Sequence, residues 1–231
     1  SAPTPAEAAV DAQIVFLCVG NDSDVRSVTV EAEGVLSTMT AGTLLVDHTT
    51  TSKALAEELY AACNDLGIAF IDAPVSGGQA GAENGVLTVM AGGEASAFEV
   101  MEPVIAAYAK HTQRMGDVGS GQVTKMVNQL CIAGILGGLS EAFHFAECAG
   151  LDIDEVTRAI QGGAAQSWQM NNRAETMAQR KYDFGFAIDW MRKDLGFALD
   201  VAQQLGLHLP VATMVDDCLL YTSDAADDET S

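Results

Sequence analysis

Short apolar runs alternate with amphipathic stretches along the first half of the chain. The run QIVFLCV, residues 13–19, is almost continuously apolar, which is typical of a buried parallel strand. Similar runs predict further strands at 43–47, 68–72 and 86–91, and a short last strand at 110–114. Leu55, Leu59 and Cys63 share one face of a predicted helix, and another helix is expected at 95–108. Strands that alternate with helices predict βαβ units and a parallel α/β sheet.

The second half of the chain has helical periodicity only. An apolar segment from 122 to 149 contains no proline and predicts one long helix. Its glycines, at 134, 137 and 138, would let another helix approach closely. Further helices are expected at 152–161, 167–180 and 187–205, separated by the glycines at 162–163, by 183–185 and by Gly206.

The change of periodicity near Gly119 predicts two domains. We expect an α/β domain with a partial Rossmann-type parallel sheet over residues 1–118, followed by an all-α domain over 119–217. The last residues, 218–231, read CLLYTSDAADDETS and are acidic and aperiodic. This tail is either disordered or not native to the protein.

The charge of the chain excludes some partners. Its 32 acidic and 11 basic residues give a formal net charge of −21, which repels nucleic acids and anionic membranes. We expect no membrane-spanning segment, since no apolar run is long enough to cross a bilayer. We also expect no signal peptide, since the start SAPTP lacks basic and apolar regions. The five cysteines form no CxxC pair and are expected to be reduced thiols in a cytoplasmic protein. We assign no metal ligands.

The segment DAPVSGG, residues 72–78, directly follows a predicted buried strand, where open α/β sheets place their ligand sites. Two adjacent glycines, Gly77 and Gly78, let the backbone approach a ligand closely. Their N–H groups and the Ser76 hydroxyl would bind a carboxylate. The alternative is an ordinary turn between a strand and a loop.

The segment GSGQVTKMVNQ, residues 119–129, opens the long helix. Lys125 lies in its first turns, and Asn128 and Gln129 follow at helical spacing, so the three share a face. A lysine is unusual in so apolar a helix. Burial lowers the pKa of a lysine, and a lysine tuned toward neutral pH can transfer a proton. The alternative is a surface lysine whose stem packs on apolar neighbours while its amine reaches water.

The segment IDWMRKD, residues 188–194, places two cations together in a chain with few of them. Arg192 and Lys193 could reach an anionic cofactor, or they could lie on a solvated helix face.

These three segments, in this order, resemble the β-hydroxyacid dehydrogenase family, which includes 3-hydroxyisobutyrate dehydrogenase and tartronate semialdehyde reductase. The resemblance covers roughly residues 13–217. It implies that Lys125 is the catalytic acid/base and that Ser76, Gly77 and Gly78 hold the substrate carboxylate.

The resemblance also implies roles for further residues. Asn128 would help to hold the substrate carboxylate, and Lys193 would approach the cofactor. Val19, Gly20 and Thr50 would flank the nicotinamide.

The chain departs from the family pattern in three ways. Gln129, which the resemblance places among the substrate-binding residues, stands where many relatives have a second asparagine; it keeps the amide but adds a methylene. The opening strand and GxGxxG turn that bind the pyrophosphate are missing, so NAD and NADP cannot be distinguished. The final helices of the family give way to the tail. We therefore expect a fragment truncated at both ends, inactive by itself, with the edge of the strand at 13–19 exposed.

The function expected of the complete protein is hydride transfer between NAD or NADP and a small 3-hydroxy acid or its semialdehyde. The substrate would be of the 3-hydroxyisobutyrate or 2-hydroxy-3-oxopropionate type. The alternatives are an imine reductase-like enzyme and a non-catalytic cofactor-binding scaffold of the same fold; Lys125 argues against both. By analogy with relatives we also expect a homo-oligomer.

Overall fold

The computed structural model describes residues 1–182 and 186–228, with side chains as far as Tyr221. The helix break expected at 183–185 lies outside these residues. The chain divides into two compact units, Ser1–Val127 and Asn128–Ser231, and the boundary falls inside one long helix, α6 (Ser120–Cys148).

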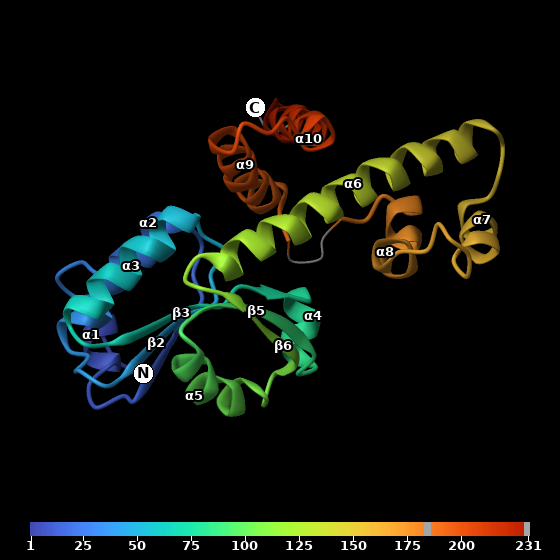
Figure 1. The fold of residues 1–231 in the computed structure, drawn as a ribbon. Helices are drawn as coiled ribbons and strands as arrows, with labels where there is room; N and C mark the ends of the chain where they lie inside the picture. The colour runs from blue at the N-terminus through green and yellow to red at the C-terminus, as the bar shows by residue number, and fades with distance from the viewer. Residues whose placement is uncertain (183–185, 229–231) are drawn as a thin grey trace. The chain divides into compact units, whose positions relative to one another are not determined.

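The first unit is built on one twisted sheet, with helices on its two faces (Figure 1). Its strands are β1 (Ile14–Leu17), β2 (Leu44–Asp47), β3 (Ala69–Asp72), β4 (Val75–Ser76), β5 (Leu87–Gly93) and β6 (Ala109–Gly116). The spatial order is β1-β2-β3-β5-β4, with β6 paired to β5. Among the described residues β1 pairs with β2 alone, so it forms an edge of the sheet. The Rossmann-type fold class is confirmed.

Two strands, β5 and β6, are parallel to each other and reverse the expected direction. β1, β2 and β3 are parallel, as predicted, but β5 runs antiparallel to β3, pairing Asp72 with Gly92. The same pairing continues past Pro74, whose carbonyl accepts a hydrogen bond from Met90, and into β4, where Ser76 pairs with Thr88. The chain from Asp72 to Ser76 is therefore continuously extended along β5, and residues 74–78 are called the arm below.

Two apolar cores hold the helices of this unit against the sheet. One face is covered by α2 (Asp22–Thr29) and α3 (Lys53–Asp65), whose buried residues include Val25, Leu55 and Leu59. The opposite face is covered by α5 (Ala95–Ile105), through Met101 and Ile105 (Figure 1). Two short helices, α1 (Pro5–Ala8) and α4 (Gly78–Glu83), and a 3₁₀ turn at Val35–Ser37 complete the unit.

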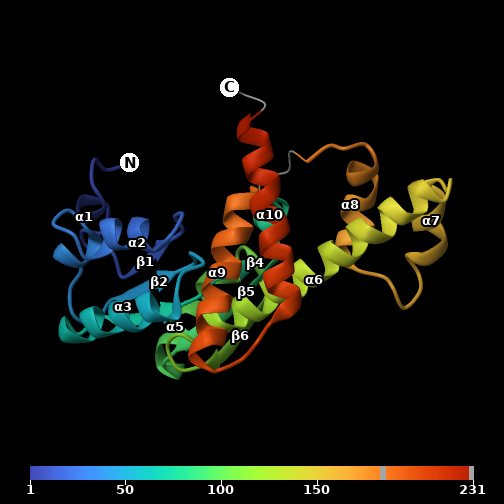
Figure 2. The ribbon, with the colours of Figure 1, turned by 90° about the horizontal axis from the view of Figure 1, so that it is seen from above.

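The second unit is all helical, as predicted. It contains the rest of α6 together with α7 (Ile153–Ile160), α8 (Trp168–Ala178), α9 (Ile188–Gln204) and α10 (Pro210–Asp228). Leu139 and Phe143 of α6 pack with α7 and α8, and Ala133 packs with α9 and α10. Figures 1 and 2 both show α9 and α10 side by side.

The structure modifies the expectations for the glycines of α6 and for the C-terminal tail. A Cβ at Gly137 would lie 3.2 Å from Val215 of α10, so the predicted close approach occurs there, whereas a Cβ at Gly138 would meet nothing within 4 Å. Instead of becoming disordered at Cys218, the chain continues as α10 to Asp228.

By length and composition α6 could cross a bilayer, contrary to the expectation that no segment is long enough. The core helix of a soluble protein passes the same test.

The first turn of α6 should tolerate no side chain at Gly121. A Cβ there would lie 2.5 Å from the Met90 carbonyl oxygen and 2.6 Å from that of Asp72, and backbone cannot yield as a flexible side chain can. We expect Gly121→Ala to lower the free energy of unfolding by about 1–3 kcal/mol or more. Gly196→Ala, inside α9 with open space at the Cβ, is the control and should be neutral or stabilising. Equal melting temperatures for the two variants would contradict the packing described.

Candidate active site

The carboxylate of Asp72 holds the start of α6 at the end of β3. Its two oxygens accept hydrogen bonds from the backbone N–H groups of Gly119, at 2.7 Å, and Gln122, at 2.9 Å. Asp72 is fully buried, and an acceptor at a helix N-terminus satisfies donors that have no partner within the helix. The helix that carries Lys125 is thereby attached to the carboxyl edge of the parallel strands.

The side chain of Gln122 attaches the same helix to the loop that follows β2. Its Nε2 donates to the carbonyl of Thr49 at 2.8 Å, and its Oε1 accepts from the N–H of Thr51 at 3.0 Å. Gln122 is buried and all of these groups are paired. The loop with Thr50, a predicted cofactor contact, is therefore fixed relative to the start of α6.

The two loops predicted to flank the nicotinamide are also joined to each other. The N–H of Val19 donates to the Thr49 hydroxyl at 3.0 Å, and the Thr49 N–H donates to Asp47 at 2.9 Å. The structure thus brings Val19, Gly20 and Thr50 to one edge of the sheet, because β1 and β2 are adjacent and parallel and both end there.

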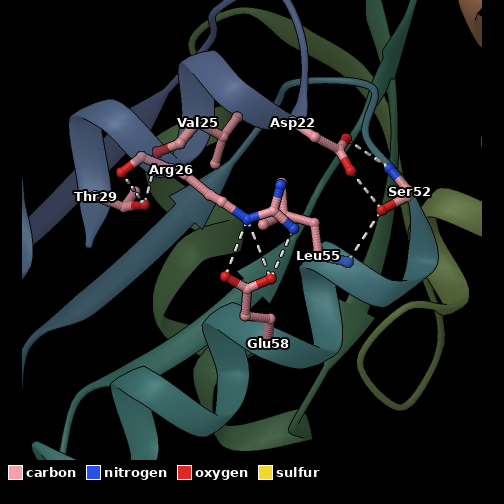
Figure 3. A network of polar contacts seen from close by, with 7 residues as sticks. All are labelled: Asp22, Val25, Arg26, Thr29, Ser52, Leu55 and Glu58. Atoms are coloured by element: carbon pink, nitrogen blue, oxygen red, sulfur yellow. Dashed lines mark hydrogen bonds and ion pairs between the residues drawn. The ribbon is translucent and has the colours of Figure 1, made fainter. Parts of the chain in front are cut away.

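Figure 3 shows how the helices behind these loops are clamped together. Asp22 of α2 accepts hydrogen bonds from the backbone N–H and the hydroxyl of Ser52, which itself caps α3. Farther along, Arg26 forms a two-pronged ion pair with Glu58, with a shortest distance of 2.7 Å. The ion pair is partly exposed and adds little stability by itself, but together the contacts fix the spacing of α2 and α3.

The predicted carboxylate-binding residues lie on the arm that β5 holds. Ser76 belongs to β4, so sheet pairing with Thr88 sets its position; residues 75–76 are not a plain loop. Gly77 and Gly78 follow with φ of 133° and 61°, a region that favours glycine. Both glycines are exposed and could present backbone N–H groups to a ligand.

Lys125 lies in the second turn of α6, three residues after Gln122 and on the same side of the helix. It is buried, with 8% of its surface exposed. The contacts of Asp72 and Gln122 position this part of α6 within the first unit.

The predicted residues of the second unit form a polar chain. The Asn128 amide donates to Gln129 Oε1 at 2.8 Å, and Gln129 Nε2 donates to Asp194 Oδ2 at 2.7 Å. Lys193 Nζ lies 3.4 Å from Asp194 Oδ1 and 5.2 Å from the centre of the Trp190 ring. Gln129 and Asp194 are both buried, so the amide of Gln129 is used inside the protein.

Sequence reasoning missed a histidine at the same edge of the sheet. His48 follows β2, and its Nδ1 lies 2.6 Å from the Ala73 carbonyl oxygen while its Nε2 lies 2.7 Å from the Tyr108 hydroxyl. Its ring stacks on Phe16 at 5.7 Å between centroids. Its one sequence signal is a titratable residue directly after a strand, which alone has no special meaning.

Burial perturbs the acid–base properties of this edge. It raises the pKa of Asp72 to about 7, although the hydrogen bonds from Gly119 and Gln122 act in the opposite direction. It lowers the pKa of His48, opposed by the bond to Ala73, and raises the pKa of Tyr108 to about 12. His48 and Tyr108 are thus neutral at pH 7. Among the side chains that the structure describes, in residues 1–182 and 186–221, no cluster suits a metal ion.

Comparison with known families divides the chain into two matches. Residues 1–126 match the family described as the NAD binding domain of 6-phosphogluconate dehydrogenase. Residues 119–230 match the family described as NAD-binding of NADP-dependent 3-hydroxyisobutyrate dehydrogenase. The two matches overlap at the start of α6.

Individual relatives agree with these matches. An uncharacterized oxidoreductase of Shewanella frigidimarina is 59% identical over 93% of this chain and 74% of its own length. The 2-hydroxy-3-oxopropionate reductase of Escherichia coli is 35% identical over 85% of this chain and 68% of its own length. The crystal structure of 3-hydroxyisobutyrate dehydrogenase from Salmonella typhimurium superposes with a TM-score of 0.87 at 33% identity, covering 96% of this chain and 78% of that one.

Asp72 should make the stability of the protein depend on pH. Because its pKa is raised on folding from an ordinary value near 3.8 to about 7, its contribution to stability is complete below pH 4 and is lost as the pH rises toward 7. We expect the free energy of unfolding of the wild type, relative to Asp72→Asn, to fall by up to about 1.4 kcal/mol per pH unit in that window. Urea unfolding at a series of pH values measures the difference. The opposite slope would mean that the hydrogen bonds to Gly119 and Gln122 outweigh burial.

Proposed function

The chain belongs to the β-hydroxyacid dehydrogenase family of NAD(P)-dependent oxidoreductases, and we propose that it interconverts a small 3-hydroxy acid and its semialdehyde with Lys125 as general acid/base. The observation that carries this proposal is the burial of Lys125 on the turn of α6 that Asp72 and Gln122 attach to the strand ends. The named relatives support a substrate of the 3-hydroxyisobutyrate or 2-hydroxy-3-oxopropionate type.

The edge of the sheet fits a nicotinamide cofactor. The hydroxyl oxygen of Thr51 is buried and has no hydrogen-bond partner among the residues that the structure describes, although it adjoins Thr50 at the carboxyl edge. An unsatisfied buried hydroxyl is costly unless a ligand completes it. We assign Val19, Gly20 and Thr50 to the nicotinamide side and Lys193 to the cofactor anion. A bound NAD or NADP would supply or accept the hydride.

The chain itself provides the proton transfer and the orientation of the substrate. In oxidation, the neutral amine of Lys125 takes the proton of the substrate hydroxyl as the carbonyl forms; in reduction, the ammonium returns it to the oxygen. Ser76, Gly77 and Gly78 bind the substrate carboxylate through a hydroxyl and backbone N–H groups. The pairing of β4 with β5 supports this role, because it holds the arm in place before substrate arrives.

The hydrogen bonds of Gln129 favour an indirect role for that residue. Its two amide atoms are already paired, one with Asp194 and one with Asn128, so it orients the Asn128 amide instead of binding substrate. Asn128 is half-buried and keeps its carbonyl oxygen for further contacts in this assignment. Glutamine is one methylene longer than asparagine, and this length allows the Gln129 amide to contact Asp194.

Two other functions remain to be separated from this one. Imine reductases share the fold, as structures from Pseudomonas sp. and Myxococcus stipitatus show at 14% and 20% identity, and a non-catalytic scaffold could share it too. Retention of Lys125 favours the dehydrogenase. Nicotinamide turnover by the full-length protein with a panel of 3-hydroxy acids, semialdehydes and cyclic imines distinguishes the three and identifies the substrate.

We also propose a cytoplasmic homo-oligomer. Large apolar side chains of α6, among them Val127, Ile135 and Phe145, are exposed in the single chain, with Phe145 exposed by 74%. A second copy that covered them would remove apolar surface from water. Light scattering coupled to size-exclusion chromatography measures the state directly.

Replacing Lys125 should remove the chemical step. We expect Lys125→Ala to lower kcat by about 10²–10⁴-fold in the full-length protein, because a positioned general acid/base typically contributes a factor of that size. Lys125→Arg should be equally impaired, since a guanidinium keeps its proton. Lys110→Ala, which removes an exposed lysine of β6, is the control and should match the wild type. A Lys125→Ala enzyme with more than a third of the wild-type kcat would exclude the assigned role.

Replacing Ser76 should affect the substrate more than the cofactor. A hydrogen bond to a charged carboxylate contributes about 1.5–3 kcal/mol, so we expect Ser76→Ala to weaken substrate affinity by about 10–100-fold. Cofactor affinity, measured by titration of the same sample, should change by less than about threefold. Ser27→Ala, on the exposed surface of α2, should change neither value. Equal losses for both ligands would point to a structural role of the arm.

A further inference from the structure

We propose that His48 is a positioning residue for substrate: its imidazole, held by Tyr108, fixes the Ala73 carbonyl and thereby the arm from Pro74 to Gly78 that binds the carboxylate. This inference rests on the proposed function and adds to it a pair of residues that neither the motifs nor the comparisons point to. The contacts that carry it all lie within the first unit.

The hydrogen bonds determine the tautomer of the imidazole. A backbone carbonyl can only accept, so at 2.6 Å from the Ala73 oxygen the Nδ1 of His48 must carry a proton. In a neutral ring Nε2 is then an acceptor, and the Tyr108 hydroxyl, 2.7 Å away, donates to it. The lowered pKa of His48 agrees with a neutral ring. Hydrogen bonding therefore runs in one direction, from Tyr108 through His48 to Ala73.

The rest of the surroundings leave the ring little freedom. His48 is 9% exposed, lies nearly parallel to the Phe16 ring at 16° and meets the Tyr108 ring edge-on at 88°. Its own backbone N–H donates to Leu17 of β1, while the N–H of Ala73 donates to Asp47 of β2. The residue thus sits where β1, β2 and β3 end, with both ring nitrogens engaged.

Ala73 is where the arm leaves the parallel sheet. Up to Asp72 the chain is held by β2, and from Val75 onward it is held by β5. Between them, the Ala73 carbonyl receives the His48 bond and the Pro74 carbonyl receives one from Met90. Since Pro74 has no N–H to donate to β5, the His48 bond adds a restraint next to the position where that donor is missing.

A role in core packing alone would explain why His48 is buried, but it would not explain the hydrogen bonds of both ring nitrogens. An apolar side chain would fill the space beside Phe16 equally well and would need no partner. The ring instead donates its one N–H to the carbonyl that precedes the substrate-binding arm, and His48 lies between Asp47, the last residue of β2, and Thr49 of the loop that follows. The expected consequence is on substrate binding, not on cofactor binding.

The tautomer can be measured without substrate or cofactor. Nitrogen-15 NMR of the 231-residue chain, labelled at its 4 histidines, reports which ring nitrogen carries the proton. The His48 signals are identified by their loss in His48→Asn. At pH 7 we expect a neutral ring protonated at Nδ1. A ring protonated at Nε2, or an imidazolium, would overturn the proposal whether or not the protein proves to be a dehydrogenase.

Two variants of equal shape test the effect on substrate. Asparagine and leucine branch alike, but only asparagine can place an N–H where Nδ1 lies. In the full-length protein we expect His48→Leu to raise the substrate KM by about tenfold or more and His48→Asn to raise it by less than about threefold. The Kd for NAD or NADP should stay within about threefold of the wild type in both, because Val19 and the two neighbours of Thr50, Thr49 and Thr51, are held by other contacts.

Two kinetic outcomes would contradict the proposal. If KM and cofactor Kd rise together, or if asparagine impairs KM as much as leucine does, His48 is a structural residue only. Should His48→Leu fail to fold, His48→Asn decides: a substrate KM near that of the wild type supports the role of the Nδ1 proton, and a tenfold rise excludes it.

Discussion

The carboxylate of Asp72 at the start of α6 is the contact on which the candidate site depends. Two hydrogen bonds, from the N–H groups of Gly119 and Gln122, fix the start of α6 against the end of β3. The fit is close because Gly121 brings the backbone of this first turn against the carbonyls of Asp72 and Met90. This arrangement buries the Asp72 side chain, and burial disfavours its charged form. The pKa of Asp72 is raised for that reason.

Three other residues help Asp72 to position the loops of the candidate site. Gln122 carries the restraint from α6 to the loop after β2, and Thr49 carries it onward to Val19 after β1. His48 connects the same loop to the arm after β3. Loops that would bind different parts of the reacting pair are therefore held by side chains of their neighbours, which is the preorganisation that a catalyst requires.

The regular elements could be predicted because their patterns are local. The strands at Leu44–Asp47 and Ala69–Asp72 and the helix Ile188–Gln204 were found within one or two residues, from apolar runs and helical spacing. The short β4 and α4 were missed, since a two-residue strand and a glycine-rich turn have no period. The acidic, aperiodic sequence after Cys218 predicts a tail, whereas α10 continues through it to Asp228.

The site could be predicted only where a motif spans it. Lys125, Ser76 and Asn128 stand in segments that resemble a family, whereas Asp72, Gln122 and His48 act through partners 25 to 73 residues away in the chain. Pairing over such distances leaves no pattern in a single sequence. The reversed direction of β5 was likewise not foreseen, because parallel and antiparallel buried strands are equally apolar.

That reversal restricts how the substrate-binding arm can evolve or be redesigned. Successive residues of an extended chain point to opposite sides, and between Asp72 and Ser76 the register with β5 is unbroken. Substituting a residue of the arm leaves this alternation intact, so substrate preference can change by exchange of side chains. Inserting or deleting one residue would turn the Ser76 hydroxyl to the other side of the sheet. Diversity among enzymes built this way should therefore arise at constant spacing, with changes of length confined to the turn beyond Gly78.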